Sequence, residues 1–492
     1  MRYYSTRDKK KKVTASQAIL AGLAADGGLF VPETIPAIAV ESLLGKDYRQ
    51  RAKAVLSDYL TDFTPAEIDA CVQSAYTAEH FGSDQIAPLF HFNDTLSFLE
   101  LWHGPTCAFK DMALQILPYF LTTSMKKQGE DKTVVILVAT SGDTGKAALS
   151  GFADVDGTRI AVFYPDQGVS NIQRLQMVTQ EGSNVFASGV KGNFDDVQAF
   201  VKQIFIDEQY REKMRRNGFE FSSANSINWG RLVPQIVYYV HAYCELVDQK
   251  KVKFGDPVNV VVPTGNFGNI LAAFYAKQAG VPIAKLICAS NQNKILTDFI
   301  RTGIYDKNRE FYVTHSPSMD ILISSNLERL LYHLSDEKTV RELMTQLSRT
   351  GRYQAPNQLK EKIQDLLWAD YCDDQETERM IAKGYQEYGY VMDPHTAVGY
   401  GVYEKYAAQT GDPTKTIIAS TASPFKFNGC VARALGEQTA GVSEFSLLHT
   451  LADKTGLALP APLADLEKKP VRFDGVVDKD GLYGAVSAFL GI

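Results

Sequence analysis

The pattern of hydrophobic positions divides the chain into a helical first part and a longer part in which strands and helices alternate. Near the N-terminus, amphipathic stretches predict helices at residues 16–23, 48–60 and 65–76. From about residue 97, apolar runs rich in β-branched residues predict strands at 133–138, 160–164, 184–187, 258–262, 285–289 and 416–419. Because these runs lack regular polar alternation, we expect parallel strands that are buried on both faces and joined by βαβ units.

This order of elements predicts an α/β fold with two open, twisted sheets and a helical N-terminal extension. We expect a mostly helical domain over residues 1–92 and a smaller α/β domain over 93–215. A larger α/β domain is expected over 216–492, with a helical insertion near 320–385. The chain length of 492 residues is ample for several such domains.

The net charge and the composition do not change the expected fold. The net charge is −6 and hydrophobic residues make up 45% of the chain, which is ordinary for a folded protein. A mildly acidic chain without a clustered basic face argues against a nucleic-acid partner. It leaves room for a small anion, because one local pocket is enough to bind one.

Cysteine and histidine spacing argues against a disulfide framework and a metal site. No two of the six cysteines lie closer than 36 residues, and no two of the eight histidines are three or four residues apart. The N-terminus has no apolar signal core, and no apolar run is long enough to span a bilayer. We therefore expect a cytoplasmic protein with no membrane partner and no metal. The oligomeric state, monomer or homodimer, stays open.

Two junctions between a predicted strand and the next helix carry glycine and small polar residues. They are SGDTG at 141–145 and GNFGN at 265–269. Free N–H groups at a helix N-terminus attract anions, and glycine lets the backbone approach them closely. Plain tight turns would also use these glycines. Neither junction matches the dinucleotide or P-loop signature, so NAD and ATP are disfavoured, although a phosphate group is still expected.

Lys110 follows a turn, HGPTCAF, and begins a helix-like segment over 112–120 among apolar neighbours. Burial and a helix N-terminus both lower the pKa of a lysine, which favours the neutral amine that attacks carbonyl carbons. The alternative is a solvated surface lysine paired with Asp111.

Two further polar clusters complete the candidate chemistry. Ser226 and Arg231 precede a long helix that begins near residue 232, and a guanidinium beside hydroxyls suits a phosphate dianion. Thr421 and Ser423 follow the strand at 416–419, although plain helix caps or turns would explain both clusters. Combined with Lys110 and the two glycine-rich junctions, they predict a lysine Schiff base with a phosphorylated aldehyde, which is pyridoxal phosphate.

The ordered motifs resemble those of the threonine synthase family. HGPTCAFKDMALQ, ATSGDTGKAAL, NSINWGR, VPTGNFGNILA and TASPFKF occur in that order, and YYSTR with ADGGLFVPE resembles the family's opening. The resemblance covers about residues 2–440. It implies pyridoxal phosphate chemistry on fold type II, the fold of tryptophan synthase β.

The resemblance also implies roles for individual residues. Lys110 would hold the cofactor covalently, Asp143 would lie near its 3′-oxygen, and Thr421 would bond its pyridine nitrogen. The cofactor phosphate would be bound by the backbone of Gly265, Asn266, Phe267, Gly268 and Asn269. The substrate would be bound by Ser141, Thr144, Ser226, Arg231 and Asn266. Ser423 stands where the family often has histidine.

The implied reaction converts O-phospho-L-homoserine and water to L-threonine and phosphate. A threonine/serine dehydratase or a phospho-lyase of the same fold is the alternative enzyme. A catalytically inert binding protein with this fold is the alternative from another class. A nucleotide-dependent enzyme is a more distant alternative.

Overall fold

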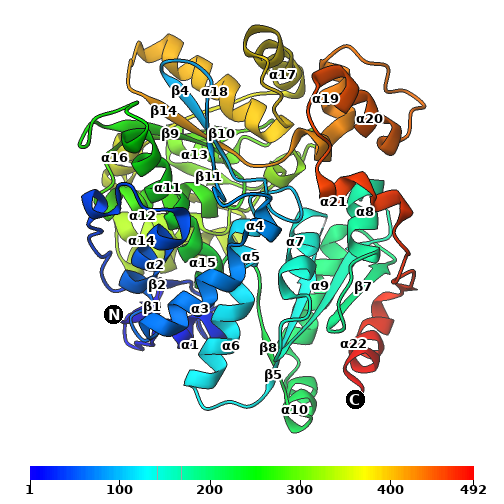
Figure 1. Ribbon diagram of the computed structural model, residues 1–492. Helices are drawn as coiled ribbons and strands as arrows, with labels where there is room; N and C mark the ends of the chain where they lie inside the picture. Colours follow the sequence, from blue (N-terminus) through cyan, green and yellow to red (C-terminus); the bar gives the residue numbers. More distant parts are fainter. Residues whose placement is uncertain (141, 168) are drawn as a thin grey trace.

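Two sheets covered by helices carry the fold in the computed structural model, which describes residues 1–140, 142–167 and 169–492 (Figure 1). The first sheet has six strands in the order β13-β10-β9-β14-β4-β3, and the second has five in the order β15-β7-β6-β5-β8. All neighbours pair in parallel except β3 and β4. No helix in the described ranges is both long and apolar enough to cross a membrane.

The six-stranded sheet draws its strands from distant parts of the chain. Its strands are β3 (Leu89–His91), β4 (Leu96–Glu100), β9 (Val258–Pro263), β10 (Ile283–Ser290), β13 (Leu367–Tyr371) and β14 (Thr416–Ser420). Helices α12 (Gly268–Gln278), α13 (Ile295–Thr302) and α18 (Pro394–Thr410) pack on its strands. Helix α11 (Trp229–Asp248) packs on α12, and the short α5 (Asp111–Leu114) and α6 (Leu117–Lys127) pack on α11. The buried pattern of β9 and β14 is that of a strand covered on both faces.

The five-stranded sheet is the second sheet that helices cover. Its strands are β5 (Thr133–Ala139), β6 (Thr158–Pro165), β7 (Val185–Val190), β8 (Phe219–Ser222) and β15 (Val476–Val477). Its helices are α7 (Asp143–Phe152), α8 (Asn171–Val178), α9 (Phe194–Ile206), α10 (Glu208–Arg216) and α22 (Leu482–Leu490). The end of the chain therefore returns to this sheet, as the red C-terminal segment in Figure 1 shows.

The remaining elements surround the two sheets. The N-terminal part contains β1 (Tyr3–Ser5), α1 (Ala15–Ala21), β2 (Phe30–Pro32), η1 (Val40–Leu43), α2 (Tyr48–Tyr59), α3 (Pro65–Ala75) and α4 (Ala78–Phe81). The middle part contains β11 (Ile304–Asp306), η2 (Pro317–Met319), α14 (Leu327–Leu334), α15 (Glu337–Thr350), β12 (Arg352–Gln354), α16 (Asn357–Leu366) and α17 (Asp374–Tyr388). The last part contains η3 (Pro424–Phe427), α19 (Asn428–Ala434), α20 (Glu444–Thr455), α21 (Ala461–Ala464), η4 (Leu466–Lys468) and η5 (Lys479–Gly481).

The six strands expected from apolar runs are all present, with ends shifted by a few residues. Two expectations need correction. The helix-like segment 112–120 is broken into α5 and α6, and Ile116 is the N-cap of α6, followed by Pro118 near its start. The region 320–385 is not wholly helical, because β13 joins the edge of the six-stranded sheet. The proposed domain boundaries stay a prediction.

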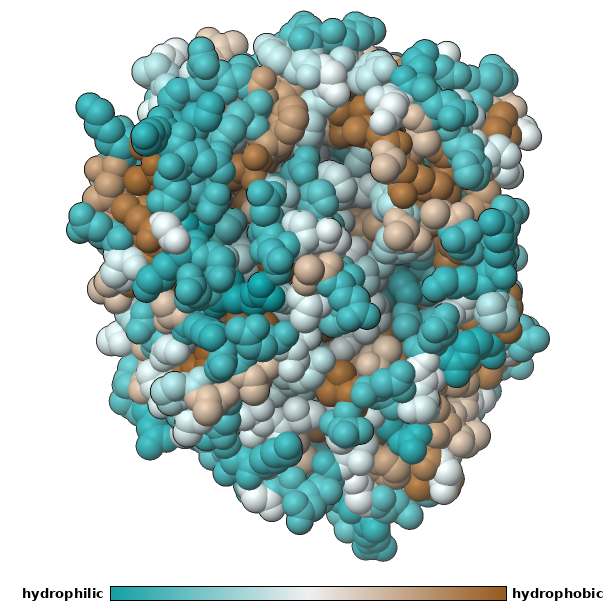
Figure 2. All heavy atoms as spheres, in the orientation of Figure 1, coloured by the Kyte–Doolittle hydropathy of each residue, from teal (hydrophilic) through white to brown (hydrophobic). Residues whose placement is uncertain are grey.

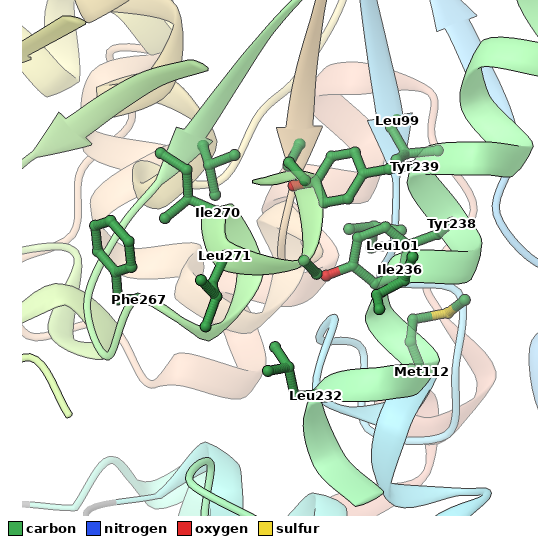
Figure 3. Packing of buried hydrophobic residues seen from close by; sticks show 14 of the residues in the cluster. Leu99, Leu101, Met112, Leu232, Ile236, Tyr238, Tyr239, Phe267, Ile270 and Leu271 are labelled. Carbon is green, nitrogen blue, oxygen red and sulfur yellow. The ribbon is translucent and has the colours of Figure 1, made fainter. Parts of the chain in front are cut away.

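A large buried cluster packs α11 and α12 against the six-stranded sheet (Figure 3). Leu271 on α12 points toward Leu232 on α11, and Ile270 and Ile236 are buried in the same cluster. Phe267 packs at the loop that precedes α12. This packing fixes where the N-termini of both helices point, and both helices carry predicted site residues near that end. Figure 2 shows a hollow near the middle of one face of the molecule.

Candidate active site

A tight turn places Lys110 at the N-terminus of α5. The buried carboxylate of Asp111 holds this turn by accepting bonds from the backbone N–H of Thr106 (2.8 Å) and from its hydroxyl (2.7 Å). Gly104 is needed beside it, because a Cβ at that position would lie 2.5 Å from the Cβ of Asp111. Asp111 therefore shapes the turn and is not the ion-pair partner of a solvated Lys110.

The amine of Lys110 lies in a mostly buried polar pocket. Its side chain is 12% exposed, and its Nζ donates to Ser318 Oγ at 3.1 Å and lies 3.5 Å from Asp143 Oδ2. Burial lowers the pKa of Lys110; Asp143 opposes this shift, while the charges of Lys426 and Arg231 add to it. The result is an amine that loses its proton more readily than an ordinary lysine.

Asp143 links Lys110 to a second lysine. Its Oδ1 lies 3.0 Å from the Nζ of Lys426 and accepts a bond from Gln173 Nε2 at 2.8 Å. Its Oδ2 accepts a bond from Ser318 Oγ at 3.1 Å. Burial alone would raise the pKa of Asp143, but the two ammonium groups outweigh it and hold that pKa well below its ordinary value. Asp143 is therefore a carboxylate fixed between two lysines.

The loop that carries Asp143 is shaped by the threonine before it. The Thr140 hydroxyl oxygen accepts bonds from the backbone N–H groups of Gly142 and Gly145, both at 3.0 Å. Gly142 has a φ of +147°, which side-chain-bearing residues rarely adopt. Thr144 lies half-buried on the first turn of α7, next to Asp143. The predicted substrate residue Ser141 lies outside the described residues.

The second glycine-rich loop, residues 265–269, presents free backbone donors. The carbonyl of Gly265 accepts a bond from Ser324 Oγ (2.7 Å), and that of Asn266 accepts one from the N–H of Asn326 (3.0 Å). None of the N–H groups of residues 265–269 donates to an acceptor within the described part of the chain. Two carbonyls of the loop are already bonded, and its N–H groups are free to donate. This arrangement suits the phosphate of pyridoxal phosphate.

Two residues fix the shape of this loop. A Cβ on Gly265 would lie 2.5 Å from the carbonyl oxygen of Ser318, so the loop approaches the backbone of the residue whose hydroxyl contacts Lys110. Phe267 has a φ of +65° and directly precedes Gly268, where α12 begins. Asn269 is buried, and its Nδ2 has no partner among the described residues. The loop thus lies next to Lys110 with donors unsatisfied.

Thr421 lies directly beside the lysine turn. Its carbonyl accepts a bond from the N–H of Phe109 at 2.8 Å, and its own N–H donates to Thr396 Oγ1 at 3.2 Å. A bridge between Ala108 and Ala422 ties the same two segments together. The segments that carry Thr421 and Lys110 are therefore adjacent, and the role of Thr421 stays a prediction. The hydroxyl of Ser423 is buried without a partner among residues 1–140, 142–167 and 169–492.

The serine cluster connects to the second loop. Ser226 Oγ lies 3.5 Å from Ser325 Oγ, and Ser325 donates to Asn266 Oδ1 at 3.3 Å. Asn326 Nδ2 donates to the carbonyl of Ser226 at 3.1 Å and to that of Asn266 at 3.0 Å. Ser226 and Asn266, separated by 40 positions in the sequence, are thus brought together by the segment that precedes α14.

Arg231 is a buried cation with a hydrogen-bond donor that an anion could use. Only 3% of it is exposed, its Nη1 donates to the carbonyl of Ala224 at 2.6 Å, and its Nε has no partner in the described ranges. Burial lowers the pKa of Arg231 to about 10, so the group stays charged at neutral pH. No carboxylate of the described residues forms an ion pair with it. An anionic group would complete this environment.

Sequence reasoning missed three contributors to the site, namely Lys426, Ser318 and Ser325. Lys426 lies within the quoted TASPFKF motif, and its position between two phenylalanines was the available signal of a buried lysine. Ser318 and Ser325 lie in a segment that carries no glycine-rich loop and follows no predicted strand. Their partners lie far away in the chain, so no local pattern reveals them.

Comparison with known proteins extends over the whole chain. Residues 2–76 match the family described as Threonine synthase N terminus, residues 88–421 match Pyridoxal-phosphate dependent enzyme, and residues 396–488 match Threonine synthase, C-terminal. The chain is 37% identical to Threonine synthase of Pseudomonas aeruginosa, over 96% of this chain and 95% of that protein. It is 42% identical to human Threonine synthase-like 1, over 93% of this chain. The match spans only 63% of the length of that relative.

Solved structures agree with this relationship. The PLP-bound threonine synthase from Brucella melitensis superposes with a TM-score of 0.88 at 36% identity, covering 100% of this chain and 98% of that one. The yeast threonine synthase gives a TM-score of 0.88 at 32% identity, with 100% and 99% covered. The fold is therefore fold type II, and the free donors around Lys110 fit pyridoxal phosphate. The chain belongs to the threonine synthase family of pyridoxal-phosphate-dependent enzymes.

Proposed function

We propose that the protein is a threonine synthase, which converts O-phospho-L-homoserine and water to L-threonine and phosphate. The observation that carries this proposal is the uncompensated Arg231, which lies near Lys110 beside the Ser226 cluster. A dehydratase acting on serine or threonine has no substrate phosphate to bind. A phosphorylated substrate explains both a second set of anion donors and a free guanidinium.

The cofactor residues divide the work in this proposal. Lys110 would hold pyridoxal phosphate, the N–H groups of residues 265–269 would bind its phosphate, and Thr421 would bond its ring nitrogen. When bound, the cofactor supplies an electron sink for the electron pair released from the substrate Cα–H bond. Asp143, which Lys426 holds in the charged form, would lie near the cofactor's 3′-oxygen.

Lys110 also moves protons in this proposal. Its lowered pKa favours the neutral amine, the form that accepts a proton from the substrate Cα at Nζ. The hydroxyl of Ser318, which accepts a bond from Nζ at 3.1 Å, would orient the free amine. The charged Asp143, 3.5 Å away, stabilises the ammonium that results.

The substrate residues act on the two ends of O-phospho-L-homoserine. Arg231, Ser226 and Asn266 bind the phosphate, and the guanidinium stabilises the charge that grows as phosphate leaves Cγ. Ser141 and Thr144 would bind the substrate's α-carboxylate or its phosphate. Water then adds at Cβ and the product is threonine, so the carbon skeleton is retained and one phosphate is released per turnover.

The free cysteines bear on the location of the protein. All six are free thiols in the structure, and five of them are buried. Unpaired thiols are typical of proteins in reducing compartments. We propose a cytoplasmic location, which fractionation against a cytosolic marker would check; recovery with a membrane or secreted fraction would contradict it.

Product analysis tests the proposed reaction. Purified holoenzyme incubated with O-phospho-L-homoserine should release threonine and inorganic phosphate in equal amounts. Lys110→Ala, which keeps the phosphate-binding loop, should release neither product. Phosphate accompanied by 2-oxobutyrate instead of threonine would favour a phospho-lyase. No product at all, with cofactor bound, would favour an inert binding protein.

A further inference from the structure

A cavity lies beside the turn that carries Lys110 and is not used by the proposed reaction. It has a volume of about 260 Å³ and lies between α7, α8 and the segment that contains α21 and η4. Figure 1 shows α21 next to α8. Its wall includes Pro105, Lys146, Gln176, Thr179 and Lys469. None of the proposed cofactor or substrate residues within the described ranges belongs to its wall.

Two lysines of this wall, Lys146 and the exposed Lys469, have no buried counter-ion among the described residues. Lys146 donates to Gln180 Oε1, and no carboxylate oxygen of the described residues lies within 4.0 Å of its Nζ. Lys469 lies 3.8 Å from Glu181, a carboxylate that is 77% exposed to solvent. An exposed pair at this distance contributes little stabilisation. Glu181 belongs to the same wall, so the two lysines and this one exposed carboxylate leave a formal excess of one positive charge.

The wall also contains neutral groups suited to an oxyanion. Gln176 is buried, and neither its Nε2 nor its Oε1 has a hydrogen-bond partner in the described part of the chain. A buried amide without partners is costly, and a ligand that both donates and accepts would satisfy it. Thr179 and Ser150 add hydroxyl groups to the same wall.

The titration of Lys146 is consistent with a missing anion. Burial, and then the positive charge of Lys469, lower the pKa of Lys146 to about 7. A bound anion would oppose both effects, since it supplies the opposite charge that the buried ammonium lacks. The geometry of the two lysines and the unsatisfied amide stands independently of this shift.

We propose that this cavity is a second ligand site, which binds a small tetrahedral oxyanion of the phosphate class between Lys146 and Lys469. Its volume is below the range of about 300–1,000 Å³ that is typical of drug-sized ligands, so a small ion suits it best. Free inorganic phosphate and the phosphate group of a small ester share this chemistry.

The site adjoins two elements of the Lys110 site. Pro105 belongs to the turn that positions Lys110, and Lys146 lies on α7, three residues after Asp143. An oxyanion bound between α7 and the C-terminal segment therefore contacts the helix that carries Asp143. If binding here alters the Lys110 site, substrate binding must alter the affinity of this cavity by the same factor.

Calorimetric titration of the holoenzyme with inorganic phosphate tests the proposal. In Arg231→Met, where phosphate binding at the substrate site is weakened, one binding event should persist. Adding Lys146→Met or Lys469→Met to that variant should weaken this event by about ten-fold or more, because each removes a charge-assisted hydrogen bond. Lys468→Met is the matched control: Lys468 is 81% exposed and pairs with Asp465, so its loss should change little.

Several outcomes would overturn the second site. Loss of all phosphate binding in Arg231→Met alone would assign the anion to the substrate site. Equal effects of Lys468→Met and Lys469→Met would indicate unspecific attraction to surface charge. Lys469→Met should keep the unfolding midpoint and the turnover number without added phosphate. Titrations of Arg231→Met with O-phospho-L-serine and with inorganic phosphate distinguish the two sources. Tighter binding of O-phospho-L-serine would assign the cavity to a phosphate ester, and tighter binding of inorganic phosphate would assign it to the free ion.

The charge of Lys146 gives a second readout. Sulfate stays a dianion across neutral pH, so its affinity for the cavity should fall as pH rises from about 6 to about 8 and Lys146 loses its proton. The charged or titratable groups that influence Lys146 are Lys469 on the C-terminal segment, Asp111 on α5, Lys426 on η3 and Cys107 in the lysine turn. A sulfate affinity unchanged over this range would contradict the assignment of Lys146.

Discussion

At the scale of residues, Asp143 contacts two lysines, Lys110 and Lys426, which differ in exposure and in hydrogen bonding. Lys426 is fully buried, with its Nζ bonded to the carbonyl of Thr106 at 2.8 Å and 3.0 Å from Asp143. Lys110 keeps 12% of its side chain exposed, donates to the hydroxyl of Ser318 at 3.1 Å and lies farther from Asp143, at 3.5 Å. Lys110 is therefore the lysine that a carbonyl compound can reach, and Lys426 is the one that fixes the charge of Asp143.

Arg231 is predicted to act chiefly on substrate phosphate. Arg231→Met should lower kcat/KM for O-phospho-L-homoserine by about ten-fold to a hundred-fold, because charged hydrogen bonds contribute about 1.5–3 kcal/mol each. Steady-state kinetics measure this effect. Arg231→Lys should recover part of the loss, since it restores the charge without the planar fork.

Two controls belong with the Arg231 variants. The visible absorbance of bound cofactor should be unchanged, because the cofactor phosphate is assigned to residues 265–269. The midpoint of thermal unfolding should show whether loss of the bond to Ala224 disturbs the fold. Unaltered kinetics in Arg231→Met would remove the main support for a phosphorylated substrate.

At the scale of elements, Thr140 is predicted to hold the loop that carries Asp143. Thr140→Val removes the acceptor for the N–H groups of Gly142 and Gly145 while keeping the side-chain shape. Leaving two buried donors unpaired should cost about 1–3 kcal/mol each and lower kcat as Asp143 loses its position. Chemical unfolding and kinetics measure both effects, and Thr140→Ser, which keeps the hydroxyl, is the matched control. Equal behaviour of the two variants would contradict this role.

Most of the central strands were predictable because their apolar runs are unbroken. β5, β9 and β14 lie within buried parallel sheets, so nearly every position is apolar and β-branched residues are frequent. β4 and β13 were not predicted. Their sequences, LSFLE and LWADY, mix polar with apolar residues. β13 is an edge strand, and β4 is separated from the opposite edge of the sheet only by the short β3.

The sequence also predicts the site residues that lie in local motifs and misses those that reach the site from distant parts of the chain. Lys110, Asp143 and residues 265–269 lie in strand–turn–helix junctions, which have a readable composition. Ser318 and Lys426 act across 208 and 283 positions of sequence separation from Lys110 and Asp143, respectively. Such contacts depend on how the sheets come together, which no local pattern contains.

At the scale of the whole molecule, a buried polar network joins the N-terminal part to α11. Arg51 on α2 is fully buried and pairs with Glu245 and Asp248, each at 2.6 Å. Its Nη1 also lies 2.9 Å from Nδ1 of His241, whose Nε2 lies 3.2 Å from the carbonyl of Ala87. The guanidinium donates to Nδ1, so the proton of the neutral imidazole lies on Nε2. Protonating Nδ1 would set two cations against each other.

This network predicts a loss of stability in acid. Burial, and then the charge of Arg51, lower the pKa of His241 to about 3 from its ordinary 6.5. The unfolded chain therefore binds a proton that the folded chain does not, and the free energy of unfolding should fall as pH decreases from 6.5 towards 3. His333, with a pKa lowered to about 4 by burial, contributes in the same direction.

Urea unfolding at several pH values measures this dependence. His241→Asn should flatten the decline between about pH 6.5 and about pH 4, because it removes one of the titrating groups. The matched control is His449→Asn, since His449 is exposed on α20 and should leave the decline unchanged. An equally steep decline in His241→Asn would assign the acid sensitivity to other groups.

The central claim is that Lys110, and not the neighbouring Lys426, carries the cofactor. Borohydride reduction of the holoenzyme, followed by proteolysis and mass spectrometry of the peptides, tests it most directly. We predict a reduced cofactor adduct on the peptide that contains Lys110, an unmodified Lys426, and no adduct in Lys110→Ala. An adduct on Lys426, or no adduct on either lysine in a holoenzyme that turns over substrate, would contradict the account.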